Sequence, residues 1–583
     1  MRIIRSVAVL AIIIGAGDAV AQTSADWSVL ERARTNTAKP TSTAISVDDL
    51  RSRLFIFADD SMRGRVLGDR GNVMGTNYIA AELKRLGLEP AGENGTYFQT
   101  VPIVERAFNE ASDVRVGARK LEAWKDYLMR DQGAGQRSID GVQTVYGGVF
   151  GVQSQMISPA AAAGKVVIVS TQPGENGSGI QGLPNRGLVA AYFEHAAAVM
   201  VIGVEALPPG SIAAYKRPTG GMKQDDPTPV VSYFYINADA ARAVFGGDFA
   251  GLAPGTVGTS FTGNAAFNET HARDFLDNPA YNVVGIIRGS DTALRNEYVA
   301  IGAHNDHVGT DPEPAVHDST YVINHLFRKQ GADDAPPNLS GGDVARVNAI
   351  LADIRRKTGG ASARIDSVYN GADDDASGSM SVLEMAEYFA GQQVKPKRSM
   401  LFIWHVGEEA GLFGSEWFTD HPTVPRESIV AQLNMDMVGR GDASDITGVT
   451  KEGAQISGSD SYVQLIGSRR LSTELGDLVE KVNTTKMHKM ALDYSLDADG
   501  HPQNIYCRSD HYSYARYGIP VVFFTTGGHA DYHQLTDEPQ YINYPHMQKV
   551  ANFVRDVAIE AANLDHRPMV DKPKPDPKGA CRQ

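Results

Sequence analysis

The stretch YVAIGAHNDH, residues 298–307, joins a run of four apolar residues directly to a cluster of polar side chains. Short continuous apolar runs bounded by glycine are typical of strands that are buried on both faces. Three similar runs follow, at residues 400–404, 429–433 and 521–524, and helix-like stretches lie between them. This alternation of strands and helices predicts an α/β fold with a mostly parallel central sheet sandwiched by helices.

Acidic and imidazole side chains follow each of the four predicted strands. Ligands of open α/β sheets bind beyond the carboxyl ends of the strands, so we expect these side chains to converge. Clustered carboxylates repel one another and raise their pKa values unless cations neutralise them. The segments concerned are GAHNDH (302–307), GEEAG (407–411), NMDM (434–437) and GHADYH (528–533), together with GADDDASG (371–378) at the start of a predicted helix.

The residue types in these clusters indicate which cation they suit. Imidazole with carboxylate and without thiolate fits zinc in an open catalytic site, with manganese or cobalt as alternatives. Two such ions sharing one carboxylate could hydrolyse an amide. The chain has only two cysteines, Cys507 and Cys581, so a thiolate site is excluded, and whether they pair cannot be read from the sequence.

Composition and the N-terminus restrict the class of protein. The 583 residues carry a formal net charge of −14, which disfavours nucleic-acid binding. Arg2 and Arg5, a ten-residue apolar run and Ala19-Val20-Ala21 predict a signal peptide over residues 1–21. The run is too short for a spanning helix, so we expect a secreted or periplasmic protein without stable membrane insertion after cleavage.

The motifs occur in the order found in the M28 family of two-zinc exopeptidases, which this chain resembles. The resemblance rests on GAHNDHVG (302–309), NGADDDASG (370–378), GEEAGLFGS (407–415), NMDM (434–437) and YHQLTD (532–537), and residues 58–65 and 92–99 look like the family's N-terminal segment. It implies a zinc exopeptidase fold, related to phosphorylases and hydrolases, and a site with two Zn²⁺. Co²⁺ or Mn²⁺ could take their place.

The resemblance also assigns roles to single residues. His304 and Asp436 would hold one zinc, Glu409 and His533 the other, and Asp374 would bridge them. These five residues form the implied ligand set.

Three further residues would support the chemistry. Glu408 would be the general base that takes a proton from a metal-bridging water and passes it to the leaving amine. Asp306 would orient His304 from behind. Tyr532 is either a donor to the oxyanion or a packed aromatic residue.

Other polar residues near the motifs have a simpler interpretation. Asp373 and Asp375 are interpreted as helix N-terminal caps. His307, His511 and His529 are interpreted as structural hydrogen-bonding residues, because a single histidine beside a motif is more often structural than a ligand.

The domain organisation follows from shifts in composition and pattern. Residues 22–45 form a flexible lead-in, residues 46–140 and 263–565 the M28-like domain, and residues 566–583 a flexible tail. Residues 141–262 resemble the small β-rich protease-associated domain and would be an insert. Residues 311–369 are a longer connection than the family usually has, and we expect them to shape the substrate pocket.

The leading hypothesis is a secreted zinc exopeptidase that acts on peptides as an aminopeptidase. A carboxypeptidase or dipeptidase on the same scaffold is an alternative, with Arg440 or Arg508 available for a free carboxylate. Glutaminyl cyclisation, which relatives with this fold perform with one zinc, and a receptor-like ectodomain without metals are further alternatives. The oligomeric state, the side-chain preference and the native metal are not specified by the sequence.

Overall fold

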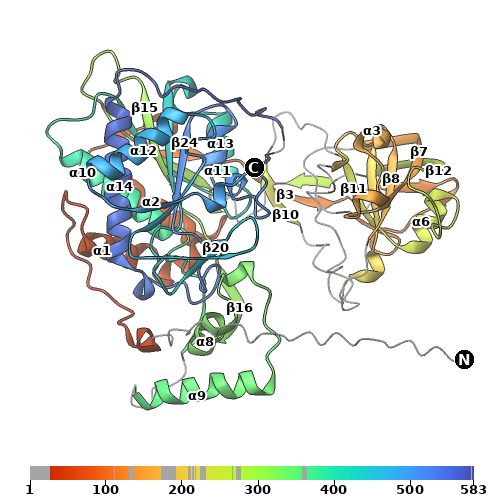
Figure 1. The fold of residues 1–583 in the computed structure, drawn as a ribbon. Helices are drawn as coiled ribbons and strands as arrows, with labels where there is room; N and C mark the ends of the chain where they lie inside the picture. The colour runs from red at the N-terminus through yellow and green to blue at the C-terminus, as the bar shows by residue number, and fades with distance from the viewer. Residues whose placement is uncertain are drawn as a thin grey trace, which may run out of the picture.

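The computed structural model describes residues 27–109, 112–129, 137–171, 189, 192–207, 212, 216, 218–223, 231–265, 267–270, 277–357, 364–579 and 581–583. The chain forms a large lobe and a smaller β-rich lobe (Figure 1). The predicted signal peptide and the start of the predicted lead-in lie outside the described residues. Within those residues, no helix has the length and apolar character needed to cross a membrane.

Four parallel strands form the centre of the main sheet in the large lobe. They are β18 (Ser399–His405), β15 (Tyr298–His304), β19 (Ile429–Met435) and β24 (Val521–Thr525), in that spatial order. All four predicted strands are confirmed. Further strands extend the sheet on both sides, mostly by antiparallel pairing, so the sheet is mixed at its edges. On the β18 side these strands are β14 (Tyr281–Ile287), β1 (Glu89–Pro90) and β2 (Phe98–Thr100). On the β24 side they are β22 (Tyr462–Ile466), which is antiparallel to β24, and β23 (Ala491–Asp493), which is parallel to β22.

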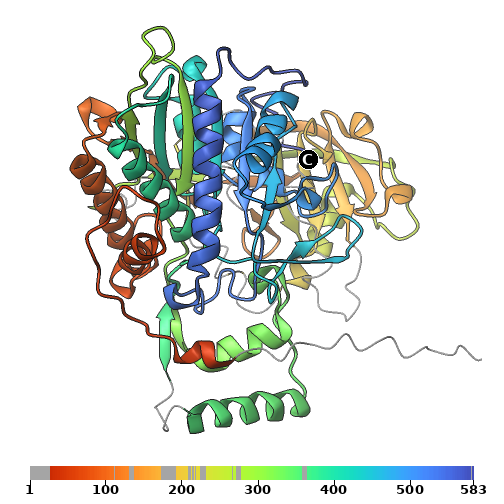
Figure 2. The same cartoon turned by 60° about the vertical axis from the view of Figure 1, so that its left-hand side comes forward.

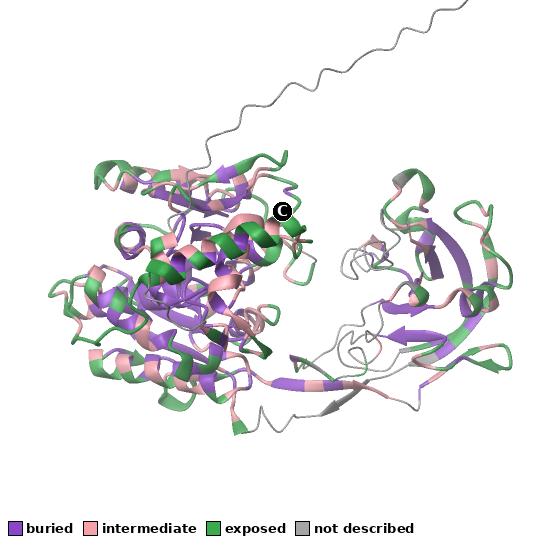
Figure 3. Ribbon diagram, turned by 90° about the horizontal axis from the view of Figure 1, so that it is seen from below, coloured by how far each residue is buried: buried purple, intermediate pink, exposed green. Residues whose placement is uncertain are grey.

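Helices cover both faces of this sheet, as the α/β pattern predicts. Alternate residues of β15 point to opposite faces: Val299, Ile301 and Ala303 join one buried cluster, while Tyr298 and Ala300 join the other. The first cluster packs against α1 (Val47–Phe57), α2 (Arg70–Leu86), α10 (Ala376–Gly391), α12 (Thr473–Thr485) and α14 (Tyr544–Asn563). The second packs against α11 (Phe413–Asp420) and α13 (His511–Ala515), and both clusters lie deep in the lobe (Figure 3).

An eight-stranded sheet forms the smaller lobe. Its strands in spatial order are β5 (Arg119–Lys120), β4 (Asp113–Val116), β12 (Val257–Ala265), β7 (Arg137–Val149), β8 (Val166–Ser170), β9 (Ala198–Ile202), β11 (Ser232–Ile236) and β6 (Tyr127–Met129). Helices α3 (Pro159–Ala162) and α6 (Ala238–Phe245) pack beside it.

The boundary of the smaller lobe differs from the sequence prediction. Strands β4, β5 and β6 belong to its sheet, so the lobe begins ahead of residue 141. These strands are two to four residues long, too short to show an alternating pattern of their own. A three-stranded sheet of β10 (Thr219–Met222), β3 (Ile103–Phe108) and β13 (Phe267–Thr270) lies between the lobes (Figure 1).

The described part of residues 311–369 forms a separate layer beside the large lobe, seen below it in Figure 2. Strand β16 (Thr310–Val316) pairs with β17 (Ile365–Val368), and α8 (His317–Phe327), a 3₁₀ turn at Gly331–Asp333 and α9 (Gly341–Lys357) lie between them. Part of the predicted lead-in packs on this layer: Trp27 meets Tyr321 edge to face, with 6.5 Å between ring centroids.

The C-terminal tail is anchored on the large lobe, in contrast to the predicted flexible coil. Cys581 forms a disulfide with Cys507, with 5.8 Å between their Cα atoms. The side chain of Gln583 accepts a hydrogen bond from the backbone N–H of Tyr506 at 3.0 Å. The composition of the tail is polar and rich in proline, but a covalent link across 74 residues leaves no local pattern in the sequence.

Candidate metal centre

The predicted ligands lie at one edge of the central sheet because parallel strands end on the same side. His304 is the last residue of β15, and Asp436 directly follows β19. Glu408 and Glu409 lie in the turn after β18, His533 in the loop after β24, and Asp374 in the turn before α10. Segments far apart in the sequence are thus brought together.

Asp374 lies between two histidines. Its Oδ1 is 3.0 Å from Nε2 of His304, and its Oδ2 is 2.9 Å from Nε2 of His533. Each carboxylate oxygen therefore faces a different imidazole nitrogen. This is the arrangement that a carboxylate shared by two metal ions requires.

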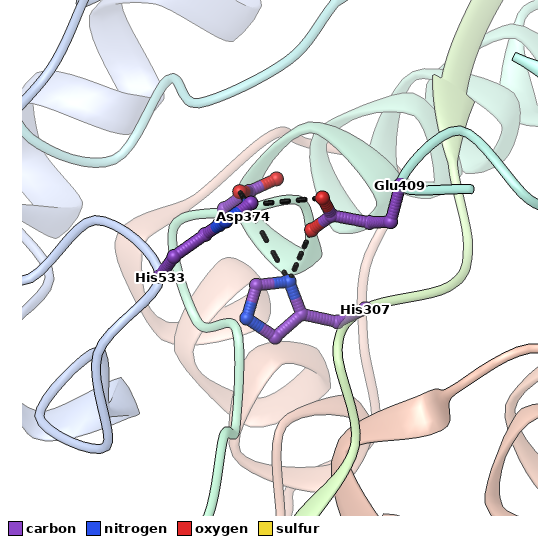
Figure 4. A group of neighbouring side chains, drawn as sticks. All are labelled: His307, Asp374, Glu409 and His533. Carbon is purple, nitrogen blue, oxygen red and sulfur yellow. Dashed lines mark hydrogen bonds and ion pairs between the residues drawn. The ribbon is translucent and has the colours of Figure 1, made fainter. Parts of the chain in front are cut away.

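One group of ligand atoms surrounds Oδ2 of Asp374 (Figure 4). Glu409 places Oε2 at 2.9 Å from Nε2 of His533 and Oε1 at 2.7 Å from Nδ1 of His307. In contrast to its interpretation as a structural residue, His307 has a ring nitrogen among the potential ligand atoms, all within 4.8 Å of one another. The signal in the sequence was its position in the same loop as His304, three residues on.

A second group lies around Oδ1 of Asp374. His304 Nε2 is 3.7 Å from Oδ1 of Asp436. Asp375 is also close, but its carboxylate already accepts hydrogen bonds from three backbone N–H groups, those of His304 at 3.0 Å, Gly378 at 2.9 Å and Met437 at 3.2 Å. Asp375 caps α10, in agreement with its interpretation as a helix cap.

The donor set fits divalent cations. The Nε2 atoms of His304 and His533 are buried, and although they lie close to the Asp374 carboxylate they make no well-directed hydrogen bond to the described residues. Burial and the neighbouring carboxylates Asp436 and Glu409 raise the pKa of Glu408 well above its ordinary value. Burial also raises the pKa of Asp436. Cations would relieve both the repulsion and the unpaired imidazole nitrogens, and this set without thiolate suits zinc.

Asp306 contacts His304 in a different way from the predicted one. Nδ1 of His304 is 3.1 Å from the backbone oxygen of Asp306, whereas the carboxylate Oδ1 is 3.8 Å away. That carboxylate accepts hydrogen bonds from the backbone N–H groups of Gly407 at 2.7 Å and Glu408 at 3.2 Å. Asp306 thus orients His304 through its main chain and holds the turn that carries Glu408 with its side chain.

The remaining polar residues near the motifs have structural partners. His529 Nε2 is 3.1 Å from Asp373 Oδ2. His511 packs between the rings of Tyr506 and Phe523, with centroid distances of 5.5 and 4.8 Å. Both histidines match their structural interpretation.

A pocket opens beside the predicted ligands. Tyr532 stacks on His533, with 4.2 Å between ring centroids, and its hydroxyl accepts a hydrogen bond from Arg508 at 3.3 Å. Asp333, from the 311–369 segment, lies 3.6 Å from Arg508. The pocket is lined by Glu408, Glu409, Asp374 and Asp436, by the polar residues Asp333, Arg508 and Tyr532, and by an apolar wall of Met437, Leu496, Ile505 and Phe523.

Unlike Arg508, Arg440 does not line the pocket. It is buried, donates a hydrogen bond to Asp531 at 3.0 Å and lies 3.8 Å from Asp537. Of the two arginines considered for a free carboxylate, only Arg508 therefore faces the pocket.

Comparisons with known proteins point to one family. The model of peptidase family M28 matches residues 360–558. Leucine aminopeptidase 1 of Coccidioides posadasii is 29% identical over 201 residues, which are 33% of this chain and 47% of the relative. Leucine aminopeptidase 1 of Uncinocarpus reesii is 26% identical over 278 residues, 43% of this chain and 65% of the relative. The chain thus spans about half to two thirds of the length of these curated relatives.

Among solved structures, a zinc aminopeptidase from Bacillus subtilis superimposes with a TM-score of 0.42 and 14% sequence identity, covering 91% of this chain and 99% of that one. An aminopeptidase from an Aneurinibacillus strain gives a TM-score of 0.42 and 15% identity, covering 91% and 97%. The family match over residues 360–558 includes Asp374, Glu408, Glu409, Asp436 and His533. Over this segment, the chain is similar to peptidase family M28.

Proposed function

We propose that the protein is a metal-dependent exopeptidase that removes residues from the amino terminus of peptides. The observation that carries the proposal is the position of Asp374, whose two carboxylate oxygens face His304 at 3.0 Å and His533 at 2.9 Å. In this proposal, two Zn²⁺ would be held at this edge of the sheet. Asp374 would serve both ions, His304 and Asp436 would complete one site, and Glu409 and His533 would complete the other.

The chemistry needs a base and an activated carbonyl group. Two divalent ions, when bound, supply Lewis-acid activation of the scissile carbonyl and of water. Glu408 lines the pocket next to these ligands, and its raised pKa suits a group that accepts a proton and returns it to the leaving amine. The backbone N–H bond from Glu408 to Asp306 fixes the position of this base. Tyr532 is the proposed donor to the oxyanion.

Support for amino-terminal specificity comes from the pocket and from the relatives. Asp333 offers a carboxylate to a free amine, and Met437, Leu496 and Phe523 offer an apolar wall to the first side chain. Both curated relatives described above are leucine aminopeptidases. With the predicted signal peptide, the proposed enzyme acts outside the cytoplasm.

A carboxypeptidase or dipeptidase is the second candidate, because Arg508 faces the same pocket. An end-blocking experiment separates the two. A leucine-initiated tetrapeptide is supplied either acetylated at its N-terminus or amidated at its C-terminus, and mass spectrometry follows shortening with zinc or with chelator. We expect the amidated peptide to lose its N-terminal leucine and the acetylated one to stay intact, with chelator stopping the reaction. Shortening of the acetylated peptide from its C-terminus would support the second candidate.

A further inference from the structure

Three ligand-type side chains meet in a second place, outside the metal centre. His317 is the first residue of α8, Asp366 belongs to β17, and Glu538 lies in the loop after His533. Their ligand atoms lie within 4.8 Å of one another, and the three residues are 0%, 6% and 3% exposed. Two of them come from the 311–369 segment and one from the large lobe.

The imidazole of His317 is oriented as in metal-binding histidines. Its Nδ1 is 3.3 Å from Oδ1 of Asp318, and its Nε2 is 3.2 Å from Oε1 of Glu538. A carboxylate at Nδ1 holds the proton there, and the lone pair of Nε2 is then directed into the cluster. In many protein metal sites, a histidine binds the metal with one ring nitrogen and donates a hydrogen bond to a carboxylate with the other.

Three polar atoms in the cluster make no well-directed hydrogen bond to the described residues, although two of them, on His317 and Glu538, lie 3.2 Å apart. They are Nε2 of His317, Oδ2 of Asp366 and Oε1 of Glu538, one from each residue. Burying polar atoms without partners costs free energy. The Nε2 atoms of His304 and His533 in the metal centre show the same feature. A cation among the three atoms would satisfy them all.

Two arginines approach Glu538 in the same cluster. Arg364 donates to Oε2 of Glu538 at 3.1 Å, so Oε1 is the oxygen that remains for a metal. Arg34, whose side chain is 45% exposed, lies 3.8 Å from that Oε1 and can turn toward solvent. Without a metal, a protonated His317 between Asp318 and Glu538 would be the alternative arrangement.

We propose that His317, Asp366 and Glu538 bind one structural divalent metal ion, which joins the 311–369 segment to the large lobe. One imidazole and two carboxylates without thiolate suit Zn²⁺. Glu538 directly follows Asp537, whose carboxylate accepts hydrogen bonds from the backbone of Asp373 and Asp374. The ion therefore also anchors the loop that supports the metal centre from behind.

Zinc content tests the proposal directly. The full chain is saturated with ZnCl₂, dialysed, and analysed for zinc per protein by mass spectrometry, beside the variants His317→Gln and His325→Gln. His325, in the same helix, is the matched control because it pairs with Asp531 outside the cluster. We expect His317→Gln to lose one equivalent of zinc relative to the wild type, and His325→Gln to lose none. An unchanged zinc content in a folded His317→Gln variant would overturn the proposal.

If His317→Gln fails to fold, zinc-soaked crystals of the wild type test the site instead. Diffraction data are collected on either side of the zinc absorption edge to locate the bound zinc ions. An anomalous peak within about 2.3 Å of His317 Nε2 supports the site, and its absence at full zinc occupancy of the metal centre refutes it. Neither outcome bears on the proposed peptidase function, which depends on the ions around Asp374.

Discussion

Asp537 holds Asp374 from behind: Oδ2 of Asp537 accepts a hydrogen bond from the backbone N–H of Asp374 at 3.2 Å. The same carboxylate accepts a bond from Asp373 N–H at 2.9 Å. Asp537 lies four residues after His533 and is buried. The loop of one proposed ligand thereby fixes the backbone of another, which presents the Asp374 side chain to both histidines.

Replacing Asp537 by Asn should weaken this support. Asparagine keeps one acceptor oxygen in place of two, and its NH₂ group faces a backbone N–H group of the turn, so the Asp374 turn loses part of its anchor. We expect zinc affinity to fall about 10- to 100-fold, as for other residues that position ligands. Competition with a chelating dye measures the affinity, and Asp460→Asn, at an exposed carboxylate, is the control. Equal zinc affinity of Asp537→Asn and wild type would contradict the role assigned to Asp537.

Glu408→Gln separates catalysis from metal binding. Glutamine keeps the size of the side chain but cannot accept and return a proton at pH 7. We expect kcat to fall by about 10²- to 10⁴-fold while zinc content stays unchanged. Glu427→Gln, at a glutamate whose side chain is 78% exposed, should leave both quantities as in the wild type. A Glu408→Gln variant with full activity would remove Glu408 from the mechanism.

The disulfide should stabilise the pocket as well as the tail. Cys507 and Cys581 are 74 residues apart, and closing a loop of that length contributes up to about 4 kcal/mol through the unfolded state. We expect Cys507→Ser with Cys581→Ser to lower the free energy of unfolding by about 2 to 4 kcal/mol. KM should rise too, because Ile505 and Arg508 line the pocket on either side of Cys507. Urea unfolding and peptide kinetics measure the two effects.

Reduction of the wild type gives an internal control for this prediction. A reductant should shift the wild-type unfolding curve to that of the double variant and leave the variant itself unaffected. Coincident curves for wild type and variant before reduction would show that the bond does not stabilise the fold.

His511 should make the large lobe sensitive to acid. Burial lowers the pKa of His511 from 6.5 to about 3. Between pH 6.5 and pH 3, His511 is protonated in the unfolded chain but stays neutral in the folded protein. The free energy of unfolding therefore declines as the pH falls toward 3, by at most about 1.4 kcal/mol per pH unit. His511→Phe should remove this part of the slope, since phenylalanine can pack against Tyr506 and Phe523.

The measurement is urea unfolding of the chelator-treated protein at pH 6.5 and pH 5. We expect the wild type to lose about 2 kcal/mol more than His511→Phe between the two values. His195→Phe, at an exposed histidine of the smaller lobe, is the control and should follow the wild type. Parallel pH profiles for wild type and His511→Phe would refute the assignment.

The central sheet and the meeting of the candidate ligands could be predicted because both follow from local patterns. Apolar runs mark buried strands, and parallel strands bring the residues after them to one edge. The sequence therefore predicts that Asp374 and His533 lie beside each other, although 159 positions separate them.

Other features depend on contacts that leave no local pattern. Strands β4 to β6 are too short to be recognised, and their sheet partners lie far along the chain. The anchored tail depends on one disulfide, and the positions of His307 and Asp537 depend on how two loops pack. In each case the deciding interaction forms only in the folded chain.

The proposed mechanism depends on Asp374 serving two metal ions, and anomalous diffraction at the zinc edge from crystals of the zinc-loaded protein can detect both. We expect two peaks about 3.5 to 4 Å apart, one near His304 and Asp436 and one near Glu409 and His533, with a carboxylate oxygen of Asp374 near each. A single peak that Asp374 does not contact, or no peak at this edge of the sheet, would contradict it.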